Sequence, residues 1–163
     1  MKINTLILLT NIFLITACAS YKSDKRYSIK ENISYAKHKR NIGDLYLAKN
    51  KKAPIVITVH GGGWDSRSKS DFDSIAKSLA SHGYNVFNIN YRLAPKHQHP
   101  SPIDDLAKAI KFLKNNYSDQ INTDKIALWG YSAGAQITFL YALKRDNNIK
   151  ALIGGGGPYD FTW

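Results

Sequence analysis

A serine stands between two glycines in residues 130–134, Gly-Tyr-Ser-Ala-Gly, where an apolar run gives way to a helical pattern. This G-x-S-x-G spacing between a strand and a helix is typical of a nucleophilic serine on a sharp turn. Side chains at Gly130 and Gly134 would collide with the adjoining strand and helix, and a turn this tight predicts strained backbone at Ser132 with an exposed hydroxyl. Taken alone, the motif also fits an ordinary glycine-rich loop.

Three consecutive glycines follow His60, directly after the apolar run at residues 54–59. In such a run the backbone N–H groups can face a bound oxygen because no side chain blocks the approach, as a developing oxyanion requires. We predict that Gly61 and Gly62 supply two donors and that Ala133, at the positive end of a helix dipole, supplies a third. The alternatives are a flexible loop or a phosphate cradle, but the lysine of a phosphate-binding loop is absent here.

A nucleophilic serine needs a base to take its proton, and no histidine follows Ser132 in the sequence. The chain has five histidines, His38, His60, His82, His97 and His99, all of which precede that serine. Two aspartates follow it, Asp146 and Asp160, as candidate acids. Other conceivable bases, none favoured by its spacing, are Lys111, Lys144, His97 and His99. The sequence therefore leaves the base unassigned.

The surrounding pattern indicates the elements that hold these motifs. Residues 27–36 and 41–48 alternate apolar and polar side chains around a basic turn, which predicts an antiparallel strand pair with one solvated face. Four further runs predict strands, at residues 54–60, 84–90, 125–130 and 150–155. Helical patterns lie between them at residues 71–82, 101–116 and 133–146. This alternation predicts an α/β class, with a mostly parallel sheet and helices on both faces.

Two helix ends have their own signals. Gly83 is expected to close the helix at 71–82, whose buried face is predicted to hold Phe72, Ile75 and Leu79. At residues 101–116, Ser101 is the predicted N-cap, Pro102 the first helical residue and Asp104 the partner in a capping box. The predicted buried stripe of this helix is Ile103, Leu106, Ala107, Ile110 and Leu113.

The motifs HGGGW at 60–64, NYRLAP at 90–95 and GYSAG at 130–134, in this order, resemble the α/β-hydrolase superfamily of esterases and lipases. The nearest branches are the hormone-sensitive-lipase-like carboxylesterases and the acetyl-esterase, feruloyl-esterase and kynurenine-formamidase-like enzymes. The resemblance begins near residue 40 and implies an α/β-hydrolase fold and ester hydrolysis through an acyl-serine, with no metal and no organic cofactor. It further implies that His60 and Gly63 shape the oxyanion loop, and that Arg92 has a structural role beneath the site.

In that superfamily the catalytic acid and histidine follow the serine on later strands. The resemblance therefore implies that this chain lacks the last strands and the C-terminal helix, and that it is inactive or weakly active as it stands. The alternatives are a non-catalytic, hydrolase-like binding lipoprotein and the product of a decaying gene. The strand at 150–155 would then form an exposed apolar edge, from which we expect low stability or aggregation.

The N-terminal segment has the pattern of an export signal at residues 1–17, with Lys2 followed by an apolar stretch too short for the ~20 residues of a spanning helix. Residues 15–18, Ile-Thr-Ala-Cys, resemble a bacterial lipobox, so Cys18 is the predicted lipidation site. It is also the only cysteine, which excludes an intrachain disulfide. Alternatives are a plain signal peptide or a buried thiol. Residues 18–26 would form a polar tether to a domain at 27–163.

A lipid at Cys18 predicts a membrane-anchored protein of the cell envelope, at the outer membrane in a Gram-negative host because Ala19 follows the cysteine. The formal net charge of +11 favours anionic lipid or glycan surfaces, although it also fits a lysine-rich composition inherited from the genome. No nucleic-acid partner is expected, since no aromatic-basic binding motif is present. The predicted partners are a small ester substrate and the membrane, and the pattern gives no oligomeric state.

Overall fold

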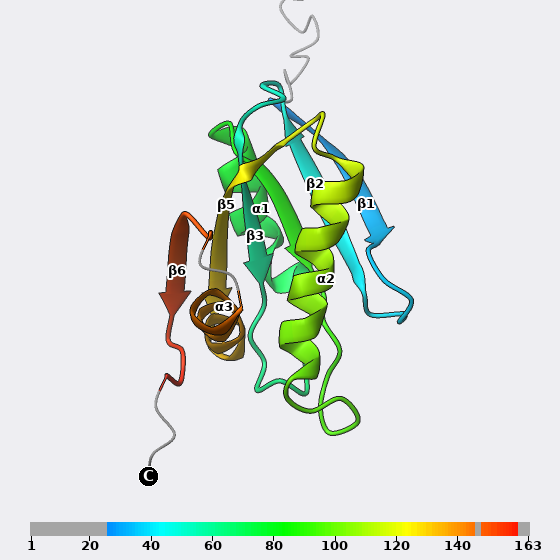
Figure 1. Ribbon diagram of the computed structural model, residues 1–163, viewed down its shortest axis with the longest axis vertical. Coiled ribbons are helices and arrows are strands. Elements are labelled where there is room, and N and C mark those ends of the chain that lie inside the picture. The colour runs from blue at the N-terminus through cyan, green and yellow to red at the C-terminus, as the bar shows by residue number, and fades with distance from the viewer. Residues whose placement is uncertain (1–25, 146–147, 160–163) are drawn as a thin grey trace, which may run out of the picture.

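The computed structural model describes residues 26–145 and 148–159, which form one mixed sheet with helices on both faces (Figure 1). The order of its six strands is β1-β2-β4-β3-β5-β6. The strands are β1 Tyr27–Ser34, β2 Ile42–Ala48, β3 Pro54–Val59, β4 Asn85–Ile89, β5 Asn122–Tyr131 and β6 Ala151–Gly155. The helices are the short 3₁₀ helix η1 Lys69–Phe72, α1 Asp73–Ser81, α2 Ser101–Asn116 and α3 Ala133–Lys144. The predicted α/β class is confirmed.

Strands β3 to β6 pair in parallel, and β2 joins β4 in antiparallel fashion. The carboxyl ends of β3 and β5 therefore lie at the same edge of the sheet, which brings the segments after Val59 and after Tyr131 together. Tyr27, at the start of β1, pairs with Ala48, whose N–H bonds to Asn85 at the beginning of β4. Tyr27 thus lies at the opposite end of the sheet from Ser132, which directly precedes α3. Figure 1 shows the start of β1 and helix α3 at opposite ends of the sheet.

The strand pair β1–β2 is antiparallel as predicted, with an irregularity between Lys30 and Ile33. The expected solvated face is present in β1 but is wrong for β2, in which Gly43 to Tyr46 are all buried. Tyr46 packs against α1 on one face, and Leu45 belongs to the main core on the other. Asp44 is buried because Lys69 pairs with it. The alternating pattern missed that this strand lies inside the sheet.

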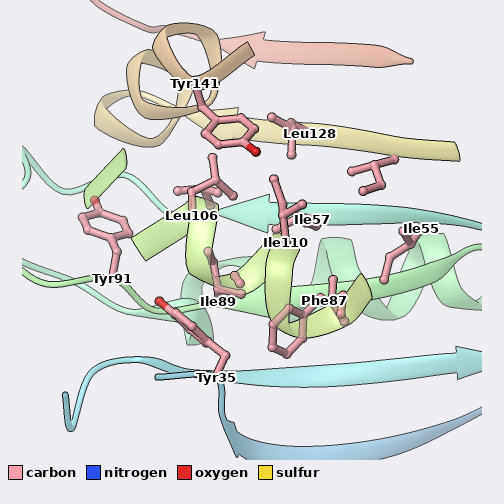
Figure 2. Packing of buried hydrophobic residues seen from close by; sticks show 14 of the residues in the cluster. Tyr35, Ile55, Ile57, Phe87, Ile89, Tyr91, Leu106, Ile110, Leu128 and Tyr141 are labelled. Atoms are coloured by element: carbon pink, nitrogen blue, oxygen red, sulfur yellow. The ribbon is translucent and has the colours of Figure 1, made fainter. Parts of the chain in front are cut away.

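The main hydrophobic core lies between the sheet and helices α2 and α3 (Figure 2). Aliphatic side chains of β3 and β4 meet Leu106 and Ile110 of α2, and Tyr141 of α3 closes the cluster over Leu128. A smaller cluster on the other face packs Ala76 and Ala80 of α1 against Tyr46 and Val86. The two clusters hold the strand ends that carry the candidate site.

Two details of the helices differ from the sequence-based expectation. Ser101 lies inside α2 and Pro100 is the N-cap, because the Pro100 carbonyl already accepts a bond from the Asp104 N–H at 3.0 Å. Asp104 makes no capping box and instead pairs with Arg145 at 2.7 Å. In the buried stripe, Asp105 is fully buried, whereas Ala107 is only partly so.

Helix α1 confirms the predicted end, since Gly83 follows the C-cap with a φ of 90°. Its fully buried positions are Ala76 and Ala80, however, and of the predicted face only Phe72, in η1, is fully buried. Ile75 and Leu79 are partly exposed because small alanines allow α1 to sit close to the sheet. Within residues 26–145 and 148–159, none of the helices has the length and apolar character that a membrane crossing demands.

Strand β6 lies at the end of the sheet order, paired with β5 alone in the described part of the chain. Ile153 on this strand is 46% exposed. The exposed edge is therefore present, while its expected effect on stability stays a prediction. The proposed signal segment, Cys18, Asp146 and Asp160 lie outside the described residues.

Candidate active site

Ser132 occupies a strained turn between β5 and α3, with φ 52° and ψ −122°. We call residues 130–134 the serine turn. A Cβ on Gly130 would stand 2.2 Å from the Gly134 carbonyl oxygen, and one on Gly134 would stand 2.1 Å from the Val59 carbonyl oxygen. Both glycines are therefore required by sterics, as the sequence predicted. The positive φ of a serine is the kind of strain that a turn presenting a nucleophile stores.

Backbone hydrogen bonds hold the serine turn in place. The Ser132 N–H donates to the Gly155 carbonyl of β6 at 2.8 Å, and the Ser132 carbonyl accepts from the Ala135 N–H at 3.0 Å. Among the residues that the structure describes, no hydrogen bond engages the Ser132 hydroxyl. That group is thus positioned by the backbone and open to a ligand.

Ser132 lines a cleft of about 660 Å³, which we call the serine cleft. Its walls combine glycine backbone with apolar side chains and one charged pair at the rim. The lining residues are Gly61, Gly62, Gly63, Arg67, Asp71, Phe72, Ile75, Trp129, Tyr131, Ser132, Ile153, Gly154 and Gly155. A volume of this size falls in the ~300–1,000 Å³ range of small-molecule sites.

The glycine loop, residues 60–67, lies directly beside the serine. A Cβ on Gly61 would stand 3.0 Å from the Ser132 Cβ and 2.9 Å from the Tyr131 carbonyl oxygen. Gly62 and Gly63 have φ angles of 102° and 58°, which suit glycine. The loop and the serine thus share one cleft, as expected from the two motifs. Ala133, the first residue of α3, is buried behind them.

His60 is fully buried at the start of the glycine loop. Its Nδ1 lies 2.7 Å from the Gly61 carbonyl oxygen, its Nε2 lies 3.4 Å from an Arg40 nitrogen, and its ring stacks on Tyr91 with centroids 4.3 Å apart. Burial lowers the pKa of His60 to about 4, so the imidazole is neutral at pH 7. Both ring nitrogens are engaged inside the fold, which leaves none for the Ser132 hydroxyl.

Arg92 is tied to helix α2 instead of the serine cleft. Its Nε donates to both Asp105 carboxylate oxygens, at 2.9 and 2.8 Å, and its backbone N–H donates to the same carboxylate at 2.9 Å. Burial acts to raise the pKa of Asp105, but the hydrogen bonds from Arg92 outweigh it and the pKa is lowered. The expected structural role of Arg92 is therefore observed, with Asp105 as the partner that the apolar pattern missed.

The candidate bases lie away from Ser132. His97 and His99 line a separate cavity of about 230 Å³ together with Trp64, and the His97 ring meets the His38 ring at a centroid distance of 4.8 Å. Lys111 and Lys144 are exposed on α2 and α3. None of these side chains lines the serine cleft. In the described residues the serine therefore has its turn and its glycine loop but no base.

A further contact between the two bends has no obvious sequence signal. The indole N–H of Trp64, at the end of the glycine run, donates to Oε1 of Gln136 in the first turns of α3 at 3.0 Å. This bond crosses from the glycine loop to the helix that follows Ser132. Arg40, in the turn before β2, was likewise missed, because nothing in the local sequence indicates that it reaches the glycine loop.

Comparison with known proteins agrees with this arrangement. The model of the BD-FAE family matches residues 44–157, which include the glycine loop, the serine turn and most of the sheet. The chain belongs to the BD-FAE family. Its sheet and serine turn, together with this family membership, show the α/β-hydrolase fold. The resemblance of its motifs to those of hydrolase-fold esterases is confirmed.

Individual relatives of this BD-FAE chain are esterases and formamidases. It is 36% identical over 117 residues to a kynurenine formamidase of Meyerozyma guilliermondii, covering 64% of this chain and 43% of that protein. It is 29% identical over 157 residues to the esterase LipC of Mycobacterium tuberculosis, covering 84% of this chain and 38% of that protein.

Among solved structures, esterase B from Lactobacillus rhamnosis superposes on this chain with a TM-score of 0.68. The superposition covers 80% of this chain and 46% of the esterase, at 23% sequence identity. This likeness is one of fold alone. The chain thus spans less than half the length of these relatives.

Proposed function

We propose that Ser132 is the nucleophile of a carboxylic-ester hydrolase. Its Oγ attacks the ester carbonyl carbon, and its proton passes to water or another base and on to the departing alcohol as the C–O bond breaks. Water then hydrolyses the acyl-serine to the acid and free serine. The observation that carries the proposal is the approach of the glycine loop to the strained serine, with a Cβ on Gly61 only 3.0 Å from the Ser132 Cβ. The N–H groups of Gly61, Gly62 and Ala133 are the proposed donors to the oxyanion.

The shape of the serine cleft supports a small, partly apolar substrate. Trp129, Ile75 and Ile153 provide apolar walls, and glycine backbone lines the cleft next to Ser132. Such walls suit a short acyl chain, an aromatic group or the acetyl group of an acetylated carbohydrate. Because one relative is a kynurenine formamidase, formamides are the second class of carbonyl compound to test.

We expect the 163-residue chain alone to be a slow catalyst. No histidine lines the serine cleft in the described residues, and a serine hydroxyl without a base is a poor nucleophile near neutral pH. An oxyanion hole and substrate binding by themselves can still supply ~10³–10⁴-fold acceleration over water. A weak, Ser132-dependent activity is therefore the expected behaviour.

A second candidate function is a binding protein that uses the same cleft without turnover. The observation that favours it is the Ser132 hydroxyl itself, which has no base among the described side chains. In this case an ester would bind beside the glycine loop and stay intact.

Prolonged reaction with a fluorophosphonate probe separates the two functions. We expect slow phosphonylation of Ser132, identified by peptide mass spectrometry, that is absent in Ser132→Ala and unchanged in Ser118→Ala, a control on an exposed loop. Unlabelled Ser132 together with saturable binding of phenyl acetate would instead support the binding protein. The absence of both labelling and binding would contradict both functions.

We also propose that Cys18 is lipidated and that the protein resides at the cell envelope. The support is the Ile-Thr-Ala-Cys sequence at residues 15–18, after an apolar stretch. Metabolic labelling with an alkyne fatty acid should mark the wild-type chain but not Cys18→Ser. Equal labelling of both would contradict the proposal.

A further inference from the structure

Arg40, in the turn between β1 and β2, reaches three acceptors around the glycine loop. Its Nε donates to the Tyr91 carbonyl at 2.7 Å, and one terminal nitrogen lies 3.0 Å from the Arg67 carbonyl oxygen and 3.4 Å from His60 Nε2. His60 and Arg67 are the two ends of the glycine loop. Arg40 itself lies before residue 44, where the BD-FAE match begins.

This guanidinium is held by backbone groups instead of a carboxylate. No ion pair to Arg40 occurs in the described part of the chain, and burial lowers its pKa. A partly buried cation without a carboxylate partner is expensive to maintain, so the carbonyl groups around it must be closely placed. The side chain therefore links the hairpin turn to the glycine loop and to the segment after β4.

The contact with Arg40 and the contact with the Gly61 carbonyl require the proton on the same nitrogen of His60. Arginine only donates hydrogen bonds, so Nε2 of the neutral His60 must accept. The proton is then on Nδ1, which donates to the Gly61 carbonyl at 2.7 Å. The Tyr91 hydroxyl lies 3.1 Å from the His60 carbonyl oxygen and 3.3 Å from the Gly61 carbonyl oxygen. The Gly61 carbonyl is thus held toward the buried side of the loop.

Holding this carbonyl sets the direction of the next N–H group. The Gly61–Gly62 peptide is trans, and in a trans peptide the C=O of one residue and the N–H of the next point in opposite directions. With the Gly61 carbonyl facing His60, the Gly62 N–H is turned away from the buried side. Gly62 lines the serine cleft, so an N–H turned away from the buried side is available to that cleft.

We infer that Arg40 is a positioning residue, which stabilises the Nδ1–H tautomer of His60 and thereby keeps the Gly62 N–H directed into the serine cleft. The effect of Arg40 on catalysis rests on the proposed function. The link from Arg40 through His60 to the Gly61 carbonyl is a property of the folded chain and can be tested without any activity.

The first test is the tautomer of His60 in the full chain, read from long-range ¹H–¹⁵N NMR spectra of the imidazole nitrogens and assigned by the loss of signals in His60→Asn. We expect the proton on Nδ1 in the wild type and in Lys39→Met, a control that removes the neighbouring exposed charge. Arg40→Met, which keeps an aliphatic stem but no donor, should shift the proton to Nε2 or give a mixture. A pure Nδ1–H form in Arg40→Met would overturn the inference.

The second test is the rate of phosphonate labelling at Ser132 in the same variants. We expect labelling of Arg40→Met to be roughly tenfold slower than labelling of the wild type. This loss is smaller than the ~10²–10³-fold loss that follows outright removal of an oxyanion donor. Lys39→Met should react like the wild type. If the wild-type chain does not label, the proposed function is contradicted. The role of Arg40 in setting the tautomer is then still decided by the NMR result.

If Arg40→Met does not fold, Arg40→Lys takes its place in both tests. Lysine keeps the charge, but its donors lie on a single nitrogen and cannot reproduce the contacts that Arg40 makes from two separate nitrogens. A mixed tautomer and slowed labelling are then expected. Wild-type spectra together with a wild-type labelling rate in Arg40→Lys would overturn the inference.

Discussion

The carbonyl oxygen of Val59 lies so close to Gly134 that a Cβ on this glycine would stand only 2.1 Å from it. Val59 is the last residue of β3, and Gly134 lies in the first turn of α3. The glycine loop begins one residue after Val59. This contact therefore holds α3 close to the end of β3, where the glycine loop begins. Several measurable consequences follow from the packing around it.

Gly134→Ala should destabilise the protein although it replaces a helical glycine. An alanine in a helix is ordinarily favoured by about 1 kcal/mol. Here the added methyl group meets backbone that cannot move without displacing β3, so we expect a net loss of about 1–3 kcal/mol or more. Denaturant unfolding measures it, with Asn115→Ala, an exposed position inside α2, as the control. A stabilised Gly134→Ala would contradict the observed contact.

Ser132→Gly should be more stable than Ser132→Ala. A non-glycine residue at φ 52° and ψ −122° carries about 1–3 kcal/mol of backbone strain, which glycine relieves. The larger conformational freedom of glycine in the unfolded chain offsets about 0.5–1 kcal/mol of this gain. We therefore expect the unfolding free energy of Ser132→Gly to exceed that of Ser132→Ala by about 1 kcal/mol. Equal values would show that the turn is unstrained.

Asp105→Ala should be far more damaging than Asp104→Ala, its neighbour on α2. Asp105 is fully buried and holds Arg92, whose side chain is 19% exposed, and breaking a buried pair costs about 3–5 kcal/mol. We expect a loss near the lower end of this range, because Arg92 can reach some water. Asp104 and Arg145 are 36% and 43% exposed, and such pairs contribute about 0–1 kcal/mol. Chemical denaturation of both variants tests the contrast, and similar losses would refute it.

Stability should fall as the pH drops from 6.5 toward 4 because of His60. Burial lowers the pKa of His60 from 6.5 to about 4, so in this range the unfolded chain binds a proton that the folded chain does not. The contribution of His60 is therefore full above pH 6.5 and is lost as the pH approaches 4, by about 3 kcal/mol in all. Urea unfolding between pH 7 and 4 measures the slope. His60→Gln should flatten it, and an unchanged slope would rule out this source.

Much of the site was predictable because its chemistry is local in the sequence. The glycines at 130 and 134 are required by close backbone contacts, and the apolar runs before each bend indicate parallel strands whose ends meet at one edge. The nearness of Gly61 to Ser132 follows from that topology. The donor roles of Gly61, Gly62 and Ala133 stay predictions that the labelling experiments address.

The missed features depend on contacts between distant segments. Asp105 interrupts an apolar helix face, and only the position of Arg92 explains why a carboxylate is buried there. Arg40 sits in a basic turn typical of a solvated surface, yet its partners come from three other places in the chain. Ser101 has the residue type of a cap, but the backbone at Pro100 starts the helix one position earlier. Local patterns carry no information about such partners.

The placement of Tyr27 and Ser132 at opposite ends of the sheet has a consequence for orientation. The nine residues 18–26 could extend about 30 Å at most, so an acyl chain on Cys18 would hold the β1 end nearest the bilayer. The mouth beside Ser132 would then open toward the surrounding aqueous phase. Molecules diffusing in that phase would reach the serine more readily than lipids of the anchoring leaflet.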